Sequence, residues 1–519
     1  MKQKIKSLFV YGMYTSLVLT AACGDDEKKE EPVATQQDSG TLSAAKQILA
    51  ELSPEQKALL DAAPSVYEFE RDGQSTVSYD GQIFRQILIE DLKTYIGNLQ
   101  RGTFQGAASD VVAALDSYYS YSFDRVITND QGINGSSLFA VSPKNLEGNA
   151  ASIAEGTSYN DIQDNGKNLR DKTAGNDNPL LREGLKGWNT NEVHGYDLTT
   201  IDADGNGDAF VEPEDLLELW FRIIGDQAAD GQSFVVSNGD QAEQSISEAY
   251  ITEDGLDLNQ LIQKFLHASV SFSQTTGDYL SSELGEGKGL LVDNEGPAKA
   301  GVTYTALEHH WDEGFGYFGA ARNYLDYTDK QIADGVSIDS NSDGNISLLT
   351  EKNFGISVNA AKRDLAASDG AIDLSSEGMK AFLQGRQLIT QKPEGYLPVV
   401  QALSIVIADN WERSLASTVI HYINKLSAEM DQYGTADYLY KDHVKYFAEM
   451  KGFALAFQFN PYSAMSAEQF DRFHELVADK PVLMQADEAS ITAYKAALLE
   501  ARQILQDVYG FSSENVANW

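Results

Sequence analysis

Apolar residues at helical spacing recur along most of this 519-residue chain, whereas the alternating pattern of a half-buried strand is scarce. A helix buries one stripe and a strand buries one face, so the two periodicities predict different folds. The best strand candidate is 75–79. The pattern predicts a mainly α fold of antiparallel helix bundles, and the length allows two packed bundles with long Asn-, Gly- and Asp-rich insertions. Helices are expected at 43–63, 83–99, 103–119, 213–224, 258–284, 303–327, 378–389, 399–430, 436–457, 467–478 and 488–508.

The N-terminal segment has the layout of a secretory signal. Three lysines precede an apolar run that ends directly before Cys23, the only cysteine in the chain. This run is too short to remain as a membrane-spanning helix. We therefore expect 1–22 to be a signal peptide, 23–42 to be a flexible acidic tether, and 43–519 to be the helical domain.

The residues around Cys23 resemble the signal of bacterial lipoproteins, in which the cysteine becomes the acylated first residue of the mature protein. Gly24, rather than an aspartate, follows it, which by the sorting rule of Gram-negative lipoproteins favours the outer membrane. The resemblance implies a cell-envelope protein that is attached to the membrane through an N-terminal lipid. The alternative is an ordinary secretory signal with an incidental cysteine.

The charge of the chain excludes one class of function. With 39 basic and 78 acidic side chains the formal net charge is −39, and such a surface repels the phosphates of nucleic acid. One cysteine forms neither an intrachain disulfide nor a cysteine cluster for zinc or iron. The sequence also lacks the H-E-x-x-H and G-x-S-x-G motifs of metallopeptidases and serine hydrolases.

Oxygen-bearing side chains alternate around a glycine in 339–351, as they do in an EF-hand calcium loop. The expected ligands are Asp339, Asn341, Asp343, the carbonyl oxygen of Asn345, and Glu351. The closing glutamate comes one residue later than in an EF-hand, so a one-residue bulge is needed to bring it in. Crowded carboxylates repel one another unless a cation neutralises them, which favours bound Ca²⁺.

A second loop of this kind, 202–215, lies at the end of a loop-rich insertion over 124–212. Its expected calcium ligands are Asp202, Asp204, Asn206, Asp208, Glu212 and Asp215. If two residues are inserted in this loop, Asp215 becomes the closing carboxylate and a helix should start beyond it. For both loops the alternative is a solvated turn, since Asp, Asn and Gly are also the usual turn residues.

Two adjacent histidines lie in a predicted helix whose apolar face should enter the core. That face consists of Leu307, Trp311, Phe315 and Phe318. His309 or His310 can pair with Glu313 at helical spacing and present a nitrogen and an oxygen to a metal. The candidate ligands for a transition metal such as iron are His309, His310, Asp312 and Glu313, with His421, His443 and Glu412 as partners from elsewhere. The alternative is a purely structural His–carboxylate hydrogen bond.

The run His-Trp-Asp-Glu at 310–313 is similar to the G-x-H-x-x-E signature of imelysin-like proteins, helical bacterial envelope proteins linked to iron uptake, although Glu308 replaces the glycine. The chain more closely resembles an uncharacterised family of bacterial lipoproteins often encoded beside imelysins and TonB-dependent receptors. The motifs that carry this likeness are 67–69, 75–79, Gly81, Gln82, Arg85, 310–319, 451–453 and 458–461. The resemblance implies a helical fold, an envelope role and a TonB-dependent receptor or an imelysin-type protein as a partner.

These features favour a non-enzymatic, calcium-stabilised lipoprotein that assists the uptake of a metal, as iron or a chelate, at the outer membrane. Two alternatives stay open. One is an imelysin-like metallopeptidase, in which Asp312 and Glu313 would form an acid–base pair. The other is a protein-interaction or adhesion module, with tyrosine-rich stretches such as 118–121 and 438–440 on its binding face.

Overall fold

The structure is a computed structural model that describes residues 40–122, 132–146, 151–163, 166–177, 184–190, 192–197, 212–368 and 372–519. The expected signal peptide, Cys23 and most of the expected tether lie outside these residues. The same holds for the first four expected ligands of the second loop, Asp202, Asp204, Asn206 and Asp208. Helix α1 begins at Gly40, within the last residues expected for the tether.

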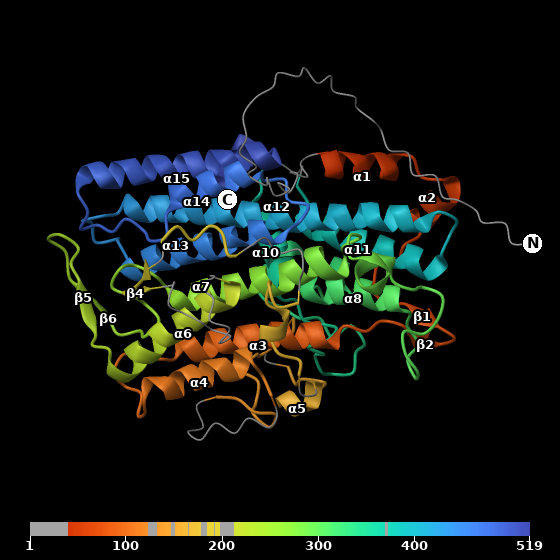
Figure 1. The fold of residues 1–519 in the computed structure, drawn as a ribbon, viewed down its shortest axis with the longest axis horizontal. Helices are drawn as coiled ribbons and strands as arrows, with labels where there is room; N and C mark the ends of the chain where they lie inside the picture. The colour runs from red at the N-terminus through yellow and green to blue at the C-terminus, as the bar shows by residue number, and fades with distance from the viewer. Residues whose placement is uncertain are drawn as a thin grey trace, which may run out of the picture. The chain divides into compact units, whose positions relative to one another are not determined.

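The described residues form a mainly α fold, which confirms the fold class expected from the sequence. The α-helices are α1 (Gly40–Ala50), α2 (Pro54–Asp61), α3 (Asp80–Gly97), α4 (Ala108–Tyr119), α5 (Tyr159–Ile162), α6 (Pro213–Asp230), α7 (Leu258–Leu266), α8 (Ala306–Phe318), α9 (Asp329–Ala333), α10 (Gly355–Ala366), α11 (Leu374–Gln391), α12 (Tyr396–Met430), α13 (Tyr440–Ala454), α14 (Ala467–Val477), α15 (Glu488–Tyr509) and α16 (Ser513–Asn518). Figure 1 shows most of the longer helices lying roughly parallel or antiparallel to one another. Each segment expected to be helical overlaps at least one of them.

Helix α12 lies at the centre of the packing. It contacts α1, α10, α11, α13 and α15, and in Figure 1 it runs through most of the helical body. All residues from Ser414 to Ile420 are buried, and two turns without an exposed residue mean that the helix is covered on every side. The main hydrophobic cluster extends from Leu60 to Trp519. The described helices therefore share one large core.

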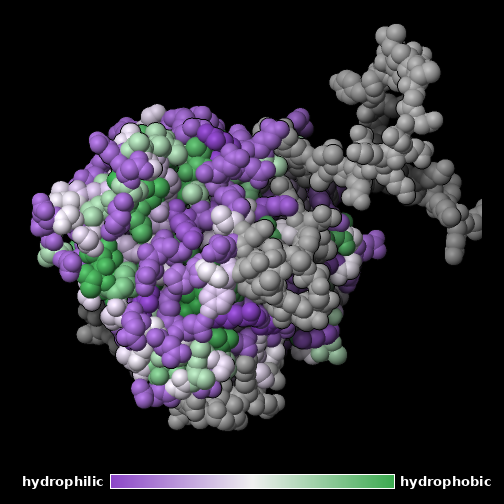
Figure 2. All heavy atoms as spheres, turned by 60° about the vertical axis from the view of Figure 1, so that its left-hand side comes forward, coloured by the Kyte–Doolittle hydropathy of each residue, from purple (hydrophilic) through white to green (hydrophobic). Residues whose placement is uncertain are grey.

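The surface of the helical body is polar for the most part. In Figure 2 hydrophilic residues predominate on the face in view, and apolar residues are scattered among them. Among the described residues, no helix combines the length and the apolar character that crossing a bilayer would require.

Strands are short, and those of the described residues form three antiparallel hairpins. These pair β1 (Glu70–Arg71) with β2 (Gln74–Ser75), β3 (Glu192–Val193) with β4 (Tyr196–Asp197), and β5 (Phe234–Val236) with β6 (Gln244–Ile246). The strand expected at 75–79 is wrong except for Ser75, because Tyr79 is already the N-cap of helix α3.

Candidate functional site

Helix α8 carries the two histidines, and its ends are set by local chemistry. The hydroxyl of Thr305 accepts the N–H of Glu308, and the Glu308 carboxylate accepts the N–H of Thr305, so the two residues close a capping box. Gly319 ends the helix with a φ of 79°, a left-handed conformation that glycine adopts without strain. The expected core face is confirmed, since Leu307, Trp311, Phe315 and Phe318 are all buried.

One side of α8 holds an ion network whose members are buried except for Arg71. Arg386 of α11 donates from Nε to Asp312 Oδ1 at 2.8 Å and from Nη1 to Glu308 Oε1 at 3.1 Å. Tyr67 also donates to Asp312, at 2.8 Å, and Arg71 of β1 donates to Glu308, at 2.7 Å. Two cations thus match two carboxylates, and buried charges are tolerated only when they are paired in this way.

The network favours the charged forms of Arg386 and Glu308. Burial opposes the charge of Arg386, but the neighbouring Asp312 and Glu308 outweigh it and hold the pKa of Arg386 above its usual value. Burial likewise opposes the charge of Glu308, and the guanidinium of Arg386 reverses the effect, so the pKa of Glu308 lies below its usual value. Both groups stay ionised at neutral pH.

The other side of α8 presents His309 and Glu313. His309 Nδ1 donates to the carbonyl oxygen of Ser78 at 2.9 Å, and its Nε2 lies 3.8 Å from Glu313 Oε1. Gln82 of α3 donates to the same Glu313 oxygen at 2.9 Å, and Tyr304 stacks on the imidazole with ring centroids 4.7 Å apart. The side chains of His309 and Glu313 are 30% and 15% exposed.

The acceptor at Nδ1 determines the tautomer of His309. A carbonyl oxygen accepts only from a protonated nitrogen, so in the neutral ring the lone pair lies on Nε2. A histidine that binds a metal usually donates its other ring N–H to a carbonyl in this manner. His310 makes the same kind of bond, from Nδ1 to the carbonyl of Gly289 at 2.8 Å, but it packs against Tyr279, whereas Glu313 lies beside His309.

The four predicted metal ligands of α8 do not share one site. His309 and Glu313 lie together, whereas the oxygens of Asp312 face Tyr67, Arg386 and the backbone N–H of Ser78. Among the described residues, no group of three or more His, Cys, Asp or Glu side chains could hold a metal ion. The partners considered from elsewhere are engaged in other contacts: Glu412 with Asn460, Ser463 and Tyr509, His443 with Tyr433 and Tyr438, and His421 with Tyr422.

The loop 339–351 is closed by its own carboxylates. Asp339 accepts the N–H groups of Asp343 and Gly344 at 3.1 and 2.9 Å. Two more of the predicted ligands make bonds within the loop: Asn341 Oδ1 accepts the N–H of Asp343, and Asp343 Oδ1 accepts the N–H of Asn345. Such bonds are compatible with a solvated turn and with a loop prepared for a cation.

The late glutamate does reach back to this loop. Glu351 is buried; its Oε1 accepts the N–H and the hydroxyl of Ser340, both at 2.7 Å, and its Oε2 accepts the N–H of Ser347 at 2.9 Å. A further carboxylate, Glu155 of the insertion, accepts from Leu348 N–H at 2.9 Å and from the Ser347 hydroxyl. Sequence reasoning missed Glu155, because it lies far from the loop along the chain.

The described part of the second loop begins helix α6. Glu212 is the N-cap, and its N–H donates to Asp215 Oδ2 at 2.8 Å. A helix is present here, but it begins at Pro213, so Asp215 lies in its first turn and not before it. Asp215 serves as a capping carboxylate in this structure, and the four expected ligands before Glu212 lie outside the described residues.

The late motif 451–453 contributes a buried cation. Lys451 donates to the carbonyl of Gly187 at 2.6 Å and to Asp479 at 3.0 Å, and its side chain is fully buried. Burial lowers the pKa of Lys451 to about 8, although Asp479 works in the opposite direction. The lysine ties the insertion to α13, which is a structural role.

The described residues form a mainly α domain. Its helices pack around the long central helix α12, and an ion network lies on one side of the histidine-bearing helix α8. Residues 64–460 match the DUF4856 family, a domain of unknown function, and the chain belongs to that family. The match covers the motifs at 67–69, 310–319 and 451–453. No curated protein and no solved structure matches the chain.

Proposed function

We propose that this protein is a non-enzymatic lipoprotein of the outer membrane that takes part in the uptake of a metal in chelated form. Its support is the pair formed by His309 Nε2 and Glu313 Oε1 on the partly exposed side of α8. In this proposal Cys23 carries the lipid that attaches the protein to the membrane. The protein's partner is a TonB-dependent receptor or an imelysin-type protein, as the resemblance to imelysin-associated lipoproteins implies.

The number of donors favours a chelate over a free ion. Metal–ligand bonds of about 2.0–2.2 Å place two ligand atoms on one ion about 3.0–3.4 Å apart, so the 3.8 Å pair must close by about half an ångström. A small side-chain rotation supplies this. Two protein ligands leave other coordination positions open, and the groups of a chelator would fill them.

The same geometry disfavours the peptidase alternative. An acid–base pair must face one substrate, but Asp312 is buried against Arg386, while Glu313 points about 100° further around the helix and accepts a hydrogen bond from Gln82. Asp312 is thus committed to the ion network.

Ferric citrate is the probe that tests the metal proposal. Glu313→Gln keeps an acceptor for Gln82 and removes the charged ligand, and His309→Gln removes the nitrogen; each is expected to weaken binding at least about tenfold in titration calorimetry. His310→Gln is the matched control, because His310 faces Gly289, and it should bind as the unaltered protein does. Equal affinity for all four proteins would refute the proposal.

We also propose that Ca²⁺ binds the loop 339–351 and stabilises it. A double variant, Asp339→Ala with Asp343→Ala, is expected to lower the melting temperature by a few degrees in calcium, because a ligand that binds only the folded state stabilises it. With chelator present, the variant should differ much less from the unaltered protein. Asp334→Ala removes an exposed acid paired with Lys330 outside the loop and is the control. An equal loss with calcium and with chelator would mean that these residues only shape a turn.

A further inference from the structure

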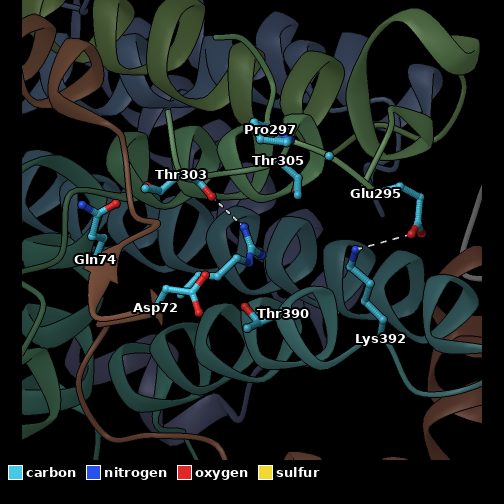
Figure 3. A pocket seen from close by; sticks show the side chains of 10 residues that line it. Asp72, Gln74, Glu295, Pro297, Thr303, Thr305, Thr390 and Lys392 are labelled. Carbon is cyan, nitrogen blue, oxygen red and sulfur yellow. Dashed lines mark hydrogen bonds and ion pairs between the residues drawn. The ribbon is translucent and has the colours of Figure 1, made fainter. Parts of the chain in front are cut away.

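A polar cavity of about 460 Å³ opens beside the ion network of α8. Its walls come from the β1–β2 hairpin, from the loop that precedes α8, and from the end of α11 with the residues that follow it (Figure 3). The charged side chains in the walls are Arg71, Asp72, Glu295 and Lys392, and the other polar ones are Gln74 and three threonines. A volume of this size suits a small metabolite.

Arg71 is the member of the ion network that reaches this cavity. From Asp312 through Arg386 and Glu308 to Arg71, negative and positive groups alternate, each hydrogen-bonded to the next. The first three are fully buried, whereas the Arg71 side chain is 38% exposed. An anion placed on Arg71 would continue the alternation.

The Arg71 guanidinium is held in place before any ligand arrives. Nη1 donates to the carbonyl of Thr303 at 2.6 Å, and Nη2 donates to Glu308 at 2.7 Å. These bonds use two of the five N–H donors of a guanidinium. A fixed fork of this kind binds a carboxylate with little loss of side-chain entropy.

The other charged side chains of the cavity favour a ligand that carries a positive group as well as a carboxylate. Lys392 Nζ lies 3.9 Å from Glu295, so that pair is nearly neutral, but the Glu295 side chain is 84% exposed and open to a second partner. Asp72 stands next to Arg71 in the turn of the hairpin and is exposed. The walls thus carry two positive and two negative groups, and a ligand with only negative charge would bring no cation to Asp72 or to the exposed side of Glu295.

We propose that this cavity binds a small zwitterion, with its carboxylate on Arg71 and its ammonium group directed to Asp72 and Glu295. A free α-amino acid and a short peptide share this chemistry and are the two sources of such a ligand. The cavity walls include neither His309 nor Glu313, so ligand binding in the cavity can be tested independently of metal binding.

Alanyl-alanine, its N-acetyl derivative, its C-terminal amide and free alanine are the probes, measured by titration calorimetry on the full chain. The N-acetyl derivative lacks the ammonium group, and the C-terminal amide lacks the carboxylate. The zwitterions are expected to bind at least about tenfold more tightly than both blocked forms, because each loses one charged hydrogen bond. Tighter binding of alanine or of the dipeptide identifies the source. Equal binding of the dipeptide and its N-acetyl form, or no binding of any probe, would overturn the proposal.

Rim variants locate the site. Asp72→Asn and Glu295→Gln keep the side-chain shape. Each should weaken binding of the dipeptide but leave binding of the N-acetyl form unchanged. Glu243→Gln removes an exposed carboxylate outside the cavity walls and should leave both affinities unchanged. Arg71→Lys keeps the charge opposite Glu308 and loses the fork, so it should weaken every carboxylate probe. If none of the three cavity variants changed the affinity for the dipeptide, the dipeptide would not bind in this cavity.

Discussion

Replacing Arg386 with methionine is expected to lower the free energy of unfolding by about 3–5 kcal/mol. The change leaves Glu308 and Asp312 buried with one cation fewer, and Arg71 pairs only with the first of them. An uncompensated buried charge is costly because the protein interior solvates it poorly. Urea denaturation of the purified protein measures the loss.

A surface ion pair supplies the comparison for this variant. Lys330→Met breaks the exposed pair with Asp334, and an exposed pair contributes about 1 kcal/mol or less. Neutralising both carboxylates in the Arg386→Met background, with Glu308→Gln and Asp312→Asn, should recover part of the stability. If Arg386→Met cost no more than Lys330→Met, the ion network would not be a main support of the fold.

Truncating Trp311 to alanine is expected to lower the free energy of unfolding by about 3–5 kcal/mol. The indole is fully buried, and its Nε1 donates to the carbonyl of Phe382 at 2.9 Å. It also fills the space next to Gly385, where an added Cβ would come within 2.0 Å of the ring. Removing the ring leaves a cavity that the rigid helices around it fill only in part. Thermal and urea unfolding both report the change.

The contact between Trp311 and Gly385 can be checked by a double-mutant cycle. Alanine normally favours a helix interior over glycine, but Gly385→Ala alone should destabilise the protein by about 1–3 kcal/mol because the methyl group meets the indole. In the Trp311→Ala background the same change should be neutral or stabilising. A stabilising Gly385→Ala in both backgrounds would contradict the contact.

Local periodicity identified the helices that bury a continuous apolar stripe. Helix α8 is the clearest case, because Leu307, Trp311 and Phe315 recur at helical spacing and all are buried. Helix α10 was not expected, and the composition of its buried face explains this. That face consists of Ile356, Ser357, Ala360, Ala361 and Arg363, which are mostly small or polar. A face of this kind leaves little periodic signal.

The candidate site was only partly predictable. Gly316 lets α3 approach α8 closely, next to Tyr79 and Gln82. The predicted metal ligands of α8 separate in the structure, with His309 beside Glu313 and Asp312 on Arg386, because helical spacing alone does not tell which carboxylate meets a cation. Asp312 pairs with Arg386, which lies 74 residues away in the sequence.

The sequence by itself determined that this chain is a mainly helical protein with a hydrophobic core, that its net charge is strongly negative, and which face of α8 is buried. These properties depend on composition and on spacing within one helix. Only the tertiary structure decided which polar groups of α8 are paired in the interior and which remain open at its edge. Ion pairs such as Glu308–Arg71 join residues 237 positions apart, and such partners are selected by packing, which no local pattern records.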